Sequence, residues 1–294
     1  MIENEPYGVE PWCLTEKSLD VDLIAQGESV FALSNGHIGL RGNLDEGEPH
    51  GLPGTYLNSL YEDRPLPYAE AGYGFPDIGQ TVINVTNGKI IRLLVNDEPF
   101  DVRYGTVHSH TRTLDLRAGT LTREVVWTSP AGHTVKVCSV RLVSLTQRAI
   151  AAIHYTVIPM ALPGADASAE PPADAPGGDP LRLVVLSELV ANEEVPAASG
   201  DPRAAAALAQ PLVSEQHSAT DGKRPRTILV HGTRRSKLRL AAGTAHEIAG
   251  PERMSLNVES FPDLGRLTVA AEVPLGQELR IVKYLGYGWS AAWA

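Results

Sequence analysis

Apolar and polar residues alternate along most of the chain from about Gln80 onward, as they do in strands with one buried face. The clearest segment, TLTREVVWTSPAGHTVKVCSVRLVSL at 120–145, predicts a hairpin that turns at SPAG. Alternation in its first arm places four residues on one face: Leu121, Arg123, Val125 and Trp127. Further short apolar runs bounded by turn residues, such as RLTVAAEVP and ELRIVKYL, predict an all-β sandwich or barrel.

Two shorter signals add detail to this prediction. The segment KIIRLLVNDEPFDV predicts two short strands around a turn at Asn96-Asp97, with Pro99 on an edge strand, where its missing N–H breaks no sheet ladder. Long helical patterns are absent from the sequence. The best helix candidate is short and begins after Asp201, a good N-cap residue.

One long interruption separates two strand-like runs. Residues 161–180 hold six Ala, five Pro, three Gly and three Asp, and strand-like sequence resumes at Leu181. Such a composition cannot bury enough apolar surface to offset its ordering entropy. We therefore expect a mobile insertion between two strands, inside one domain.

Charge and cysteine content indicate which classes of partner and which cellular compartment fit this chain. The 294 residues include 35 acidic and 25 basic ones, a net charge of −10, which argues against nucleic acid. Cys13 and Cys138 lack CxxC spacing, and no signal sequence or membrane-length apolar run is present. We expect a cytoplasmic protein with reduced thiols and no membrane partner.

The glycine-rich stretch SVFALSNGHIGLRGNLDEG at 29–47 is the first candidate for chemistry. It lacks the lysine of a P-loop, and its GxxGxxG spacing is not the GxGxxG of a dinucleotide site. Glycines permit turns and close backbone approach, so we interpret the stretch as an ordered, turning loop. That loop fixes polar side chains, including Asn35, His37 and Arg41.

Other candidate chemistry is weaker. His108 and His110 are expected on the same side of a strand, but no third ligand lies at a metal-site spacing. The neighbouring carboxylates Asp45 and Glu46 are not expected to face one pocket, as paired acid–base groups would. We assign no catalytic and no metal-binding residue to the chain.

A set of specific segments in the first half of the chain supplies a family resemblance. In order, they include EPW at 10–12, FALSNGHIGLRG at 31–42, LDEG at 44–47, GTYLNSLYE at 54–62 and PYAE at 67–70. Together with INVTN, LDLRAGTLTR and RLVSL further along, they resemble the N-terminal domain of glycoside hydrolase family 65. That family includes maltose, kojibiose and trehalose phosphorylases and related hydrolases.

The resemblance implies a fold and a domain plan. Residues 1–285 would form an all-β super-sandwich of the galactose mutarotase-like kind with few short helices. Residues 286–294 would begin the linker to an absent (α/α)6 catalytic barrel. The four-residue spacing of Trp289 and Trp293 fits a helix there.

The resemblance also implies a reaction, carried out by the barrel. A barrel glutamic acid would protonate the glycosidic oxygen of an α-glucosidic disaccharide, and inorganic phosphate would attack the anomeric carbon with inversion. Phosphorolysis and hydrolysis both remain open, and no cofactor is implied beyond phosphate as a co-substrate. Alone, the chain is expected to be inactive.

Partners and site residues follow from the same resemblance. We expect the chain to contact its own catalytic barrel, to meet the disaccharide through the whole enzyme, and to form a homodimer. Six residues are candidates for interdomain or substrate contact: Asn35, His37, Arg41, Glu46, Tyr68 and Glu70.

Two other functions remain open at this stage. A mutarotase or epimerase on this fold would need a His and a Glu facing each other across one concave sheet, for which His154 and Glu188 are candidates. A free-standing carbohydrate-binding module would need a platform of exposed rings, with four candidates: Tyr56, Tyr61, Tyr68 and Tyr73.

Overall fold

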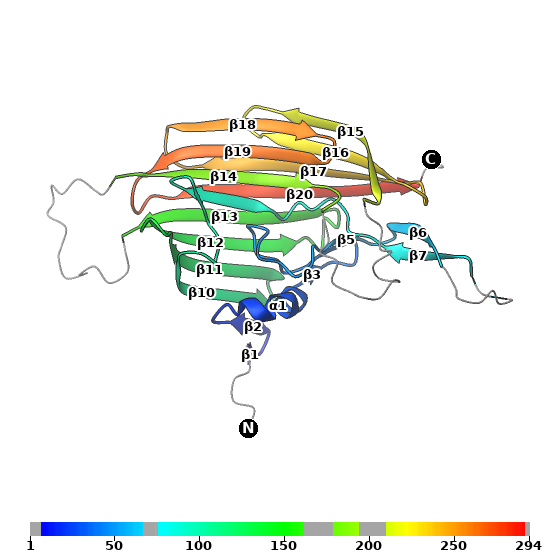
Figure 1. Cartoon of the computed structure of the whole chain (residues 1–294), viewed down its shortest axis with the longest axis horizontal. Helices are drawn as coiled ribbons and strands as arrows, with labels where there is room; N and C mark the ends of the chain where they lie inside the picture. The colour runs from blue at the N-terminus through cyan, green and yellow to red at the C-terminus, as the bar shows by residue number, and fades with distance from the viewer. Residues whose placement is uncertain (1–6, 67–73, 75, 162–178, 194–209, 292–294) are drawn as a thin grey trace, which may run out of the picture.

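The chain forms an all-β sandwich, seen in a computed structural model that describes residues 7–66, 74, 76–161, 179–193 and 210–291 (Figure 1). The larger sheet has ten strands, in the order β1 (Gly8–Glu10), β2 (Cys13–Glu16), β10 (Thr106–Asp115), β11 (Thr120–Thr128), β12 (Thr134–Val143), β13 (Ile150–Met160), β20 (Leu279–Ala291), β17 (Leu238–Ala249), β16 (Arg226–Thr233) and β15 (Leu212–Thr220). The smaller sheet has five, in the order β18 (Met254–Phe261), β19 (Leu264–Val273), β14 (Leu181–Val190), β8 (Ile91–Val95) and β9 (Glu98–Pro99). All named pairs of strands are antiparallel, from β1–β2 to β8–β9.

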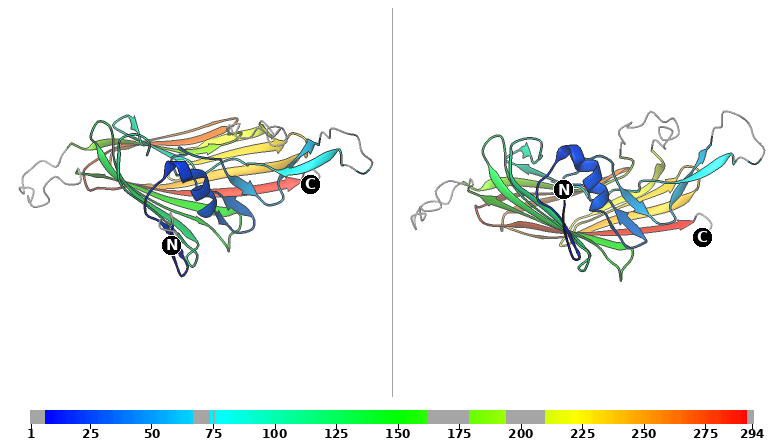
Figure 2. Two further views of the ribbon diagram at one scale, coloured as in Figure 1. Left: turned by 60° about the horizontal axis from the view of Figure 1, so that its bottom comes forward. Right: turned by 90° about the horizontal axis from the view of Figure 1, so that it is seen from below.

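Smaller elements lie beside these sheets. They are the three-stranded sheet β3 (Leu33–Ser34), β4 (Ile38–Leu40), β5 (Thr55–Leu57), the hairpin β6 (Tyr61–Pro65), β7 (Ile78–Val82), a 3-10 turn η1 (Val21–Leu23) and one short helix, α1 (Ile24–Val30). Figures 1 and 2 show the β6–β7 hairpin projecting from the body of the molecule.

The smaller sheet covers only part of the larger one. Its inner side packs on the half formed by β20, β17, β16 and β15, where alternate residues such as Ile281, Leu267 and Val185 form the apolar core. The inner face of the other half, from β10 to β13, is covered instead by residues 24–57, here named the inner segment. The apolar core continues into this half through side chains such as Val125 and Trp127, and three buried arginines of the large sheet also lie here.

The predicted hairpins are confirmed. The 120–145 segment forms β11 and β12, paired from Thr120↔Leu142 to Thr128↔Thr134. The turn between β8 and β9 uses Asn96 and Asp97 at φ 47° and 67°, the left-handed region that a tight hairpin turn requires. Pro99 lies on β9, at the edge of its sheet.

The prediction of a linker helix from residue 286 is wrong. β20 continues as a strand to Ala291 because β17 offers hydrogen-bonding partners along its whole length, including Leu240 opposite Trp289. The helical interpretation of the tryptophan spacing fails with it. Trp293, the helix expected after Asp201 and most of the insertion (162–178) lie outside the described residues. The strands that flank the insertion, β13 and β14, belong to different sheets.

Candidate functional site

The inner face of the large sheet carries three arginines, one on each of the neighbouring strands β10, β11 and β12: Arg112, Arg123 and Arg141. All three are buried because alternation directs them toward the inner segment rather than toward solvent. A buried guanidinium is costly without a carboxylate or carbonyl partner. The inner segment supplies most of these partners.

Asp45 binds the arginine of β12. Its carboxylate accepts hydrogen bonds from Arg141 Nη2 at 2.7 Å and from Ser139 Oγ at 2.6 Å, with Arg123 Nη1 at 3.6 Å. Burial alone would raise the pKa of the Asp45 carboxyl, but Arg141 and Arg123 outweigh it and hold the pKa below its ordinary value.

Glu46 binds the arginine of β11. Arg123 Nη1 lies 2.9 and 2.8 Å from its two carboxylate oxygens, and Tyr155 OH donates to Oε1 at 3.1 Å. Burial raises the pKa of Glu46 despite Arg123, and neighbouring Asp45 raises it further. The expectation that Asp45 and Glu46 would not face one pocket is wrong, because both carboxylates approach Arg123 from a loop rather than from a strand. Both are buried, so this pair is sealed from substrate.

Arg112 connects three segments. Its Nε and Nη2 donate to the two oxygens of Glu16 at 2.7 and 2.9 Å, and its Nη1 donates to the carbonyl of Gly42 at 3.0 Å. A Cβ on Gly42 would lie only 2.6 Å from the Cβ of Phe31. The third glycine of the glycine-rich stretch at 29–47 is therefore needed for close approach.

Asn35, Arg41 and His37 support the fold locally. Asn35 Nδ2 donates to the carbonyls of Ser144 and Arg148 at 2.6 and 2.9 Å, while its Oδ1 accepts from the backbone of His37 at 2.9 Å. Arg41 Nη2 donates to the carbonyl of Ala25 at 3.0 Å and lies 3.4 Å from buried Glu28. His37 contributes through its backbone, since its N–H donates to Asn35 and its carbonyl accepts from the N–H of Asn58 at 2.9 Å.

The structure therefore joins Glu46 to the buried network and uses Asn35 and Arg41 as internal braces. Tyr68 and Glu70 lie outside the described residues. Sequence analysis did not identify Arg123 as a network residue, although its place among Leu121, Val125 and Trp127 on an apolar face was a signal.

The β6–β7 hairpin, here named the arm, is anchored at its base. The Glu62 carboxylate is buried and accepts hydrogen bonds from the backbone N–H groups of Arg235 at 3.0 Å and Ser236 at 2.7 Å. Ser236 Oγ donates in return to the carbonyl of Tyr61 at 2.6 Å. These bonds hold the arm against the turn between β16 and β17.

Beyond its anchor, the arm exposes apolar side chains. Ile78 is 63% exposed and Val82 is 61% exposed, both on β7. Tyr56 and Tyr61, at the start of this region, are only half-buried, and the other two rings of the supposed platform lie outside the described residues.

His154 and Glu188 do not meet. Tyr155 faces the interior from β13, so His154 points to the opposite, outer face of the large sheet. Ser187 reaches His246 across the sandwich at 2.8 Å, so Glu188 points to the outer face of the small sheet. The two side chains lie on opposite outsides of the sandwich, which removes the support for a mutarotase-like pair.

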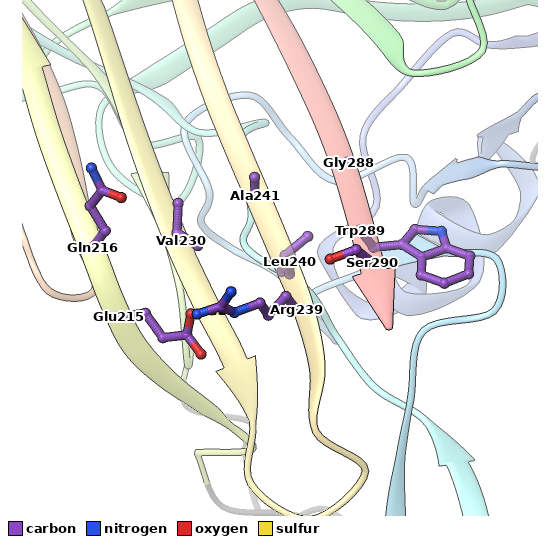
Figure 3. A pocket seen from close by; sticks show the side chains of 9 residues that line it. All are labelled: Glu215, Gln216, Val230, Arg239, Leu240, Ala241, Gly288, Trp289 and Ser290. Atoms are coloured by element: carbon purple, nitrogen blue, oxygen red, sulfur yellow. Dashed lines mark ion pairs between the residues drawn. The ribbon is translucent and has the colours of Figure 1, made fainter. Parts of the chain in front are cut away.

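A shallow groove of about 410 Å³ lies on the outer face of the large sheet, over β15, β16, β17 and β20 (Figure 3). Arg239 and Glu215 form an ion pair across it at 2.8 Å. The indole of Trp289 points away from this pair, so it does not line the groove with its ring (Figure 3).

Metal-ligating side chains do not converge in the described part of the chain: no group of three or more His, Cys, Asp or Glu could hold an ion there. The expectation that His108 and His110 share a side is wrong, because a bulge between Val107 and Ser109 shifts the register. Among the described residues, no helix is long and apolar enough to span a membrane.

Comparison with known proteins decides the family. Residues 14–294 match the model of glycosyl hydrolase family 65, N-terminal domain. This chain belongs to glycosyl hydrolase family 65. Over 291 residues the domain is 56% identical to an uncharacterised glycosyl hydrolase of Mycobacterium tuberculosis, covering 99% of this chain and 34% of that protein.

More distant relatives of this family-65 domain carry named activities. An alpha,alpha-trehalose phosphorylase of Thermoanaerobacter brockii is 39% identical over 162 residues, which are 54% of this chain and 21% of that protein. A solved structure provisionally described as a kojibiose phosphorylase from the human microbiome has a TM-score of 0.76 at 19% identity, covering 97% of this chain and 33% of that one. The first confirms the resemblance and the second the fold. The chain spans about a third or less of the length of these relatives.

Proposed function

We propose that this family-65 N-terminal domain holds a catalytic (α/α)6 barrel in place in an enzyme that cleaves α-glucosidic disaccharides. The relatives support the substrate class, since they include trehalose, nigerose, kojibiose and maltose phosphorylases. The barrel would supply the general acid, and inorganic phosphate or water would be the nucleophile. The domain supplies no catalytic group in this proposal, and no cofactor takes part.

The observation that carries the proposal is the anchored arm. A free hairpin of two strands is at best marginally stable in water, yet Glu62 holds this one against the body while Ile78 and Val82 remain exposed. A projecting hairpin that is anchored by a buried carboxylate is useful when the hairpin has another surface to contact. We propose that this surface belongs to the barrel.

The test compares matched variants in the 294-residue chain and in the full-length enzyme. Ile78→Asp removes an exposed apolar side chain from the arm, and Leu145→Asp makes the same change at an exposed loop position. In the isolated chain both should change the unfolding free energy by no more than about 0.5 kcal/mol. In the full-length enzyme only Ile78→Asp should lower the melting temperature and the rate of phosphate-dependent cleavage of trehalose or kojibiose.

Two outcomes would overturn the proposal. One is an arm variant that behaves like the loop control in the full-length enzyme. The other is cleavage of any of these disaccharides by the isolated chain.

We also propose that the full-length enzyme is a homodimer. An apolar patch on the β1–β2 edge supports this, since Val9, Trp12 and Leu116 are all exposed. Trp12 adopts φ 73°, a costly conformation for a bulky residue. Light scattering measures the mass in solution of the full-length enzyme and of its Trp12→Ala variant. A monomeric wild-type enzyme would refute the proposed homodimer.

A further inference from the structure

The outer face of the small sheet carries a row of four charged side chains on four strands, β18, β19, β14 and β8: Glu259, Arg266, Glu188 and Arg92. Glu188 occupies the centre of the row. It accepts hydrogen bonds from Arg92 Nε at 3.0 Å and from Arg266 Nε at 2.9 Å, and Arg266 Nη2 lies 2.7 Å from the same carboxylate. Arg266 Nη1 also reaches Glu259 at 3.3 Å.

The row combines a buried centre with accessible flanks. The Glu188 side chain is 4% exposed, whereas Arg92 is 42% exposed and Arg266 is 31% exposed. Both guanidiniums use their Nε edges on Glu188, which fixes their orientation. A guanidinium has five N–H donors, and within the described part of the chain Arg92 uses only Nε on Glu188 and Nη1 on the Glu46 carbonyl at 3.4 Å. Oriented donors therefore remain available to a ligand.

An apolar row lies directly beside the charged one. Leu264 on β19 is paired with Phe261 on β18 and with Val190 on β14, two positions along from the charged residues and so on the same face. The Phe261 side chain is 49% exposed. Apart from Glu259, the residues of the two rows line a groove of about 620 Å³, within the ~300–1,000 Å³ of small-molecule sites.

The charge balance of the groove argues against an anion. The two guanidiniums that line it are balanced by two carboxylates, those of Glu188 and Asp263, so the groove carries no net positive charge. An apolar ligand would leave the exposed guanidiniums without partners, at a cost in desolvation. The groove instead suits an uncharged ligand that has both a flat apolar face and many hydroxyl groups.

A pyranose ring has these properties. Its C–H-rich face packs against an aromatic ring, which here is Phe261. Its neighbouring hydroxyls can accept from the paired N–H groups of a guanidinium and donate to a carboxylate. We propose that the groove between Phe261 and the Arg266–Glu188–Arg92 row binds a neutral oligosaccharide. This proposal does not depend on the function of the barrel.

Isothermal titration calorimetry of the 294-residue chain with maltohexaose and with cellohexaose tests the proposal. At least one should bind with a Kd of about 1 mM. Phe261→Ala should weaken that binding about tenfold. Leu256→Ala is the matched control, since Leu256 is also exposed on β18 but on the alternate side of the strand, and it should bind like the wild type.

A second variant and a competitor complete the test. Arg92→Ala removes donors that would reach the sugar, so it should weaken binding. The variant should still unfold as a folded protein does, because Glu188 stays paired with Arg266. Inorganic phosphate at about 10 mM, a concentration about ten times the Kd expected for the oligosaccharide, should not displace the sugar. The proposal is overturned if neither oligosaccharide binds at about 10 mM, if Phe261→Ala binds like the Leu256→Ala control, or if phosphate displaces the sugar.

Discussion

Asp45 and Arg141 form a 2.7 Å ion pair inside the sandwich, although 96 residues separate them along the chain. Both side chains are buried. Such a pair does not rank as a strong net stabiliser by itself, because desolvation offsets much of its attraction. Its significance is that neither partner can be removed cheaply.

Replacing one partner of this pair should therefore be severe. We expect Asp45→Ala to lower the unfolding free energy by about 3–5 kcal/mol, because Arg141 would remain buried without its carboxylate. Glu124→Ala, which breaks the exposed pair with Lys136, is the control and should cost less than about 1 kcal/mol. Urea unfolding of both variants measures the difference, and equal losses would contradict the buried role.

Lys283 gives the domain a specific pH dependence. Its Nζ donates to the carbonyls of Ile90 at 3.0 Å and Glu188 at 2.7 Å, two bonds that a neutral amine can make. Burial lowers the pKa of Lys283 to about 7, with Glu188 acting in the opposite direction. Between about pH 7 and pH 10 the unfolded chain, with an ordinary lysine pKa of about 10.4, binds up to one proton more at this residue than the folded chain.

The contribution of Lys283 to the free energy of unfolding should therefore rise from pH 7 to pH 9, by up to about 1.4 kcal/mol per pH unit. In Lys283→Met this contribution disappears, so the variant should show a flatter profile than the wild type. Lys136→Met, at an exposed position, should keep the wild-type slope. Urea unfolding at several pH values makes the comparison, and parallel profiles for wild type and Lys283→Met would mean that the amine stays charged.

Alanine substitutions at two glycines of positive φ allow the cost of backbone strain to be compared with the cost of steric clash. A Cβ on Gly105 (φ 73°) would lie 2.3 Å from the carbonyl oxygen of Thr128, whereas one on Gly119 (φ 67°) would meet nothing within 4 Å. Gly119→Ala should cost about 1–2 kcal/mol, the conformational penalty alone. Gly105→Ala should cost about 1–3 kcal/mol more, because the backbone must also shift. Thermal unfolding compares the two variants. Similar losses of stability would show that the backbone around Thr128 shifts easily to make room for the added methyl group.

The anchor of the arm can be tested without any catalytic partner. Glu62→Ala leaves the N–H groups of Arg235 and Ser236 without their acceptor, at a cost of about 1–3 kcal/mol for a buried donor. We expect faster hydrogen exchange at these two amides and in β7, with the apolar core unchanged. Asp63→Ala, next along the same strand, should leave the exchange rates as they are. Unchanged protection in Glu62→Ala would mean that other contacts hold the arm.

Local features of this fold were predictable and long-range ones were not. Alternation identified β11 and β12 because each strand carries its own signal, and the Asn96-Asp97 turn is recognisable from its residue types. The partner of Arg123 was not predictable, since Glu46 lies 77 residues away in a loop without periodicity. The same limit explains the error at Trp289, whose spacing fits a helix but whose neighbour β17 imposes a strand.

The inner segment also sets an order of events during synthesis. Asp45 emerges 96 residues before Arg141, which at about 5–20 residues per second is roughly 5–20 s of translation. Through that interval its carboxylate has no guanidinium of β12 to bind, and the charged loop must stay hydrated. The inner segment therefore stays without the arginine of β12 until nearly half of the 294-residue chain has been made.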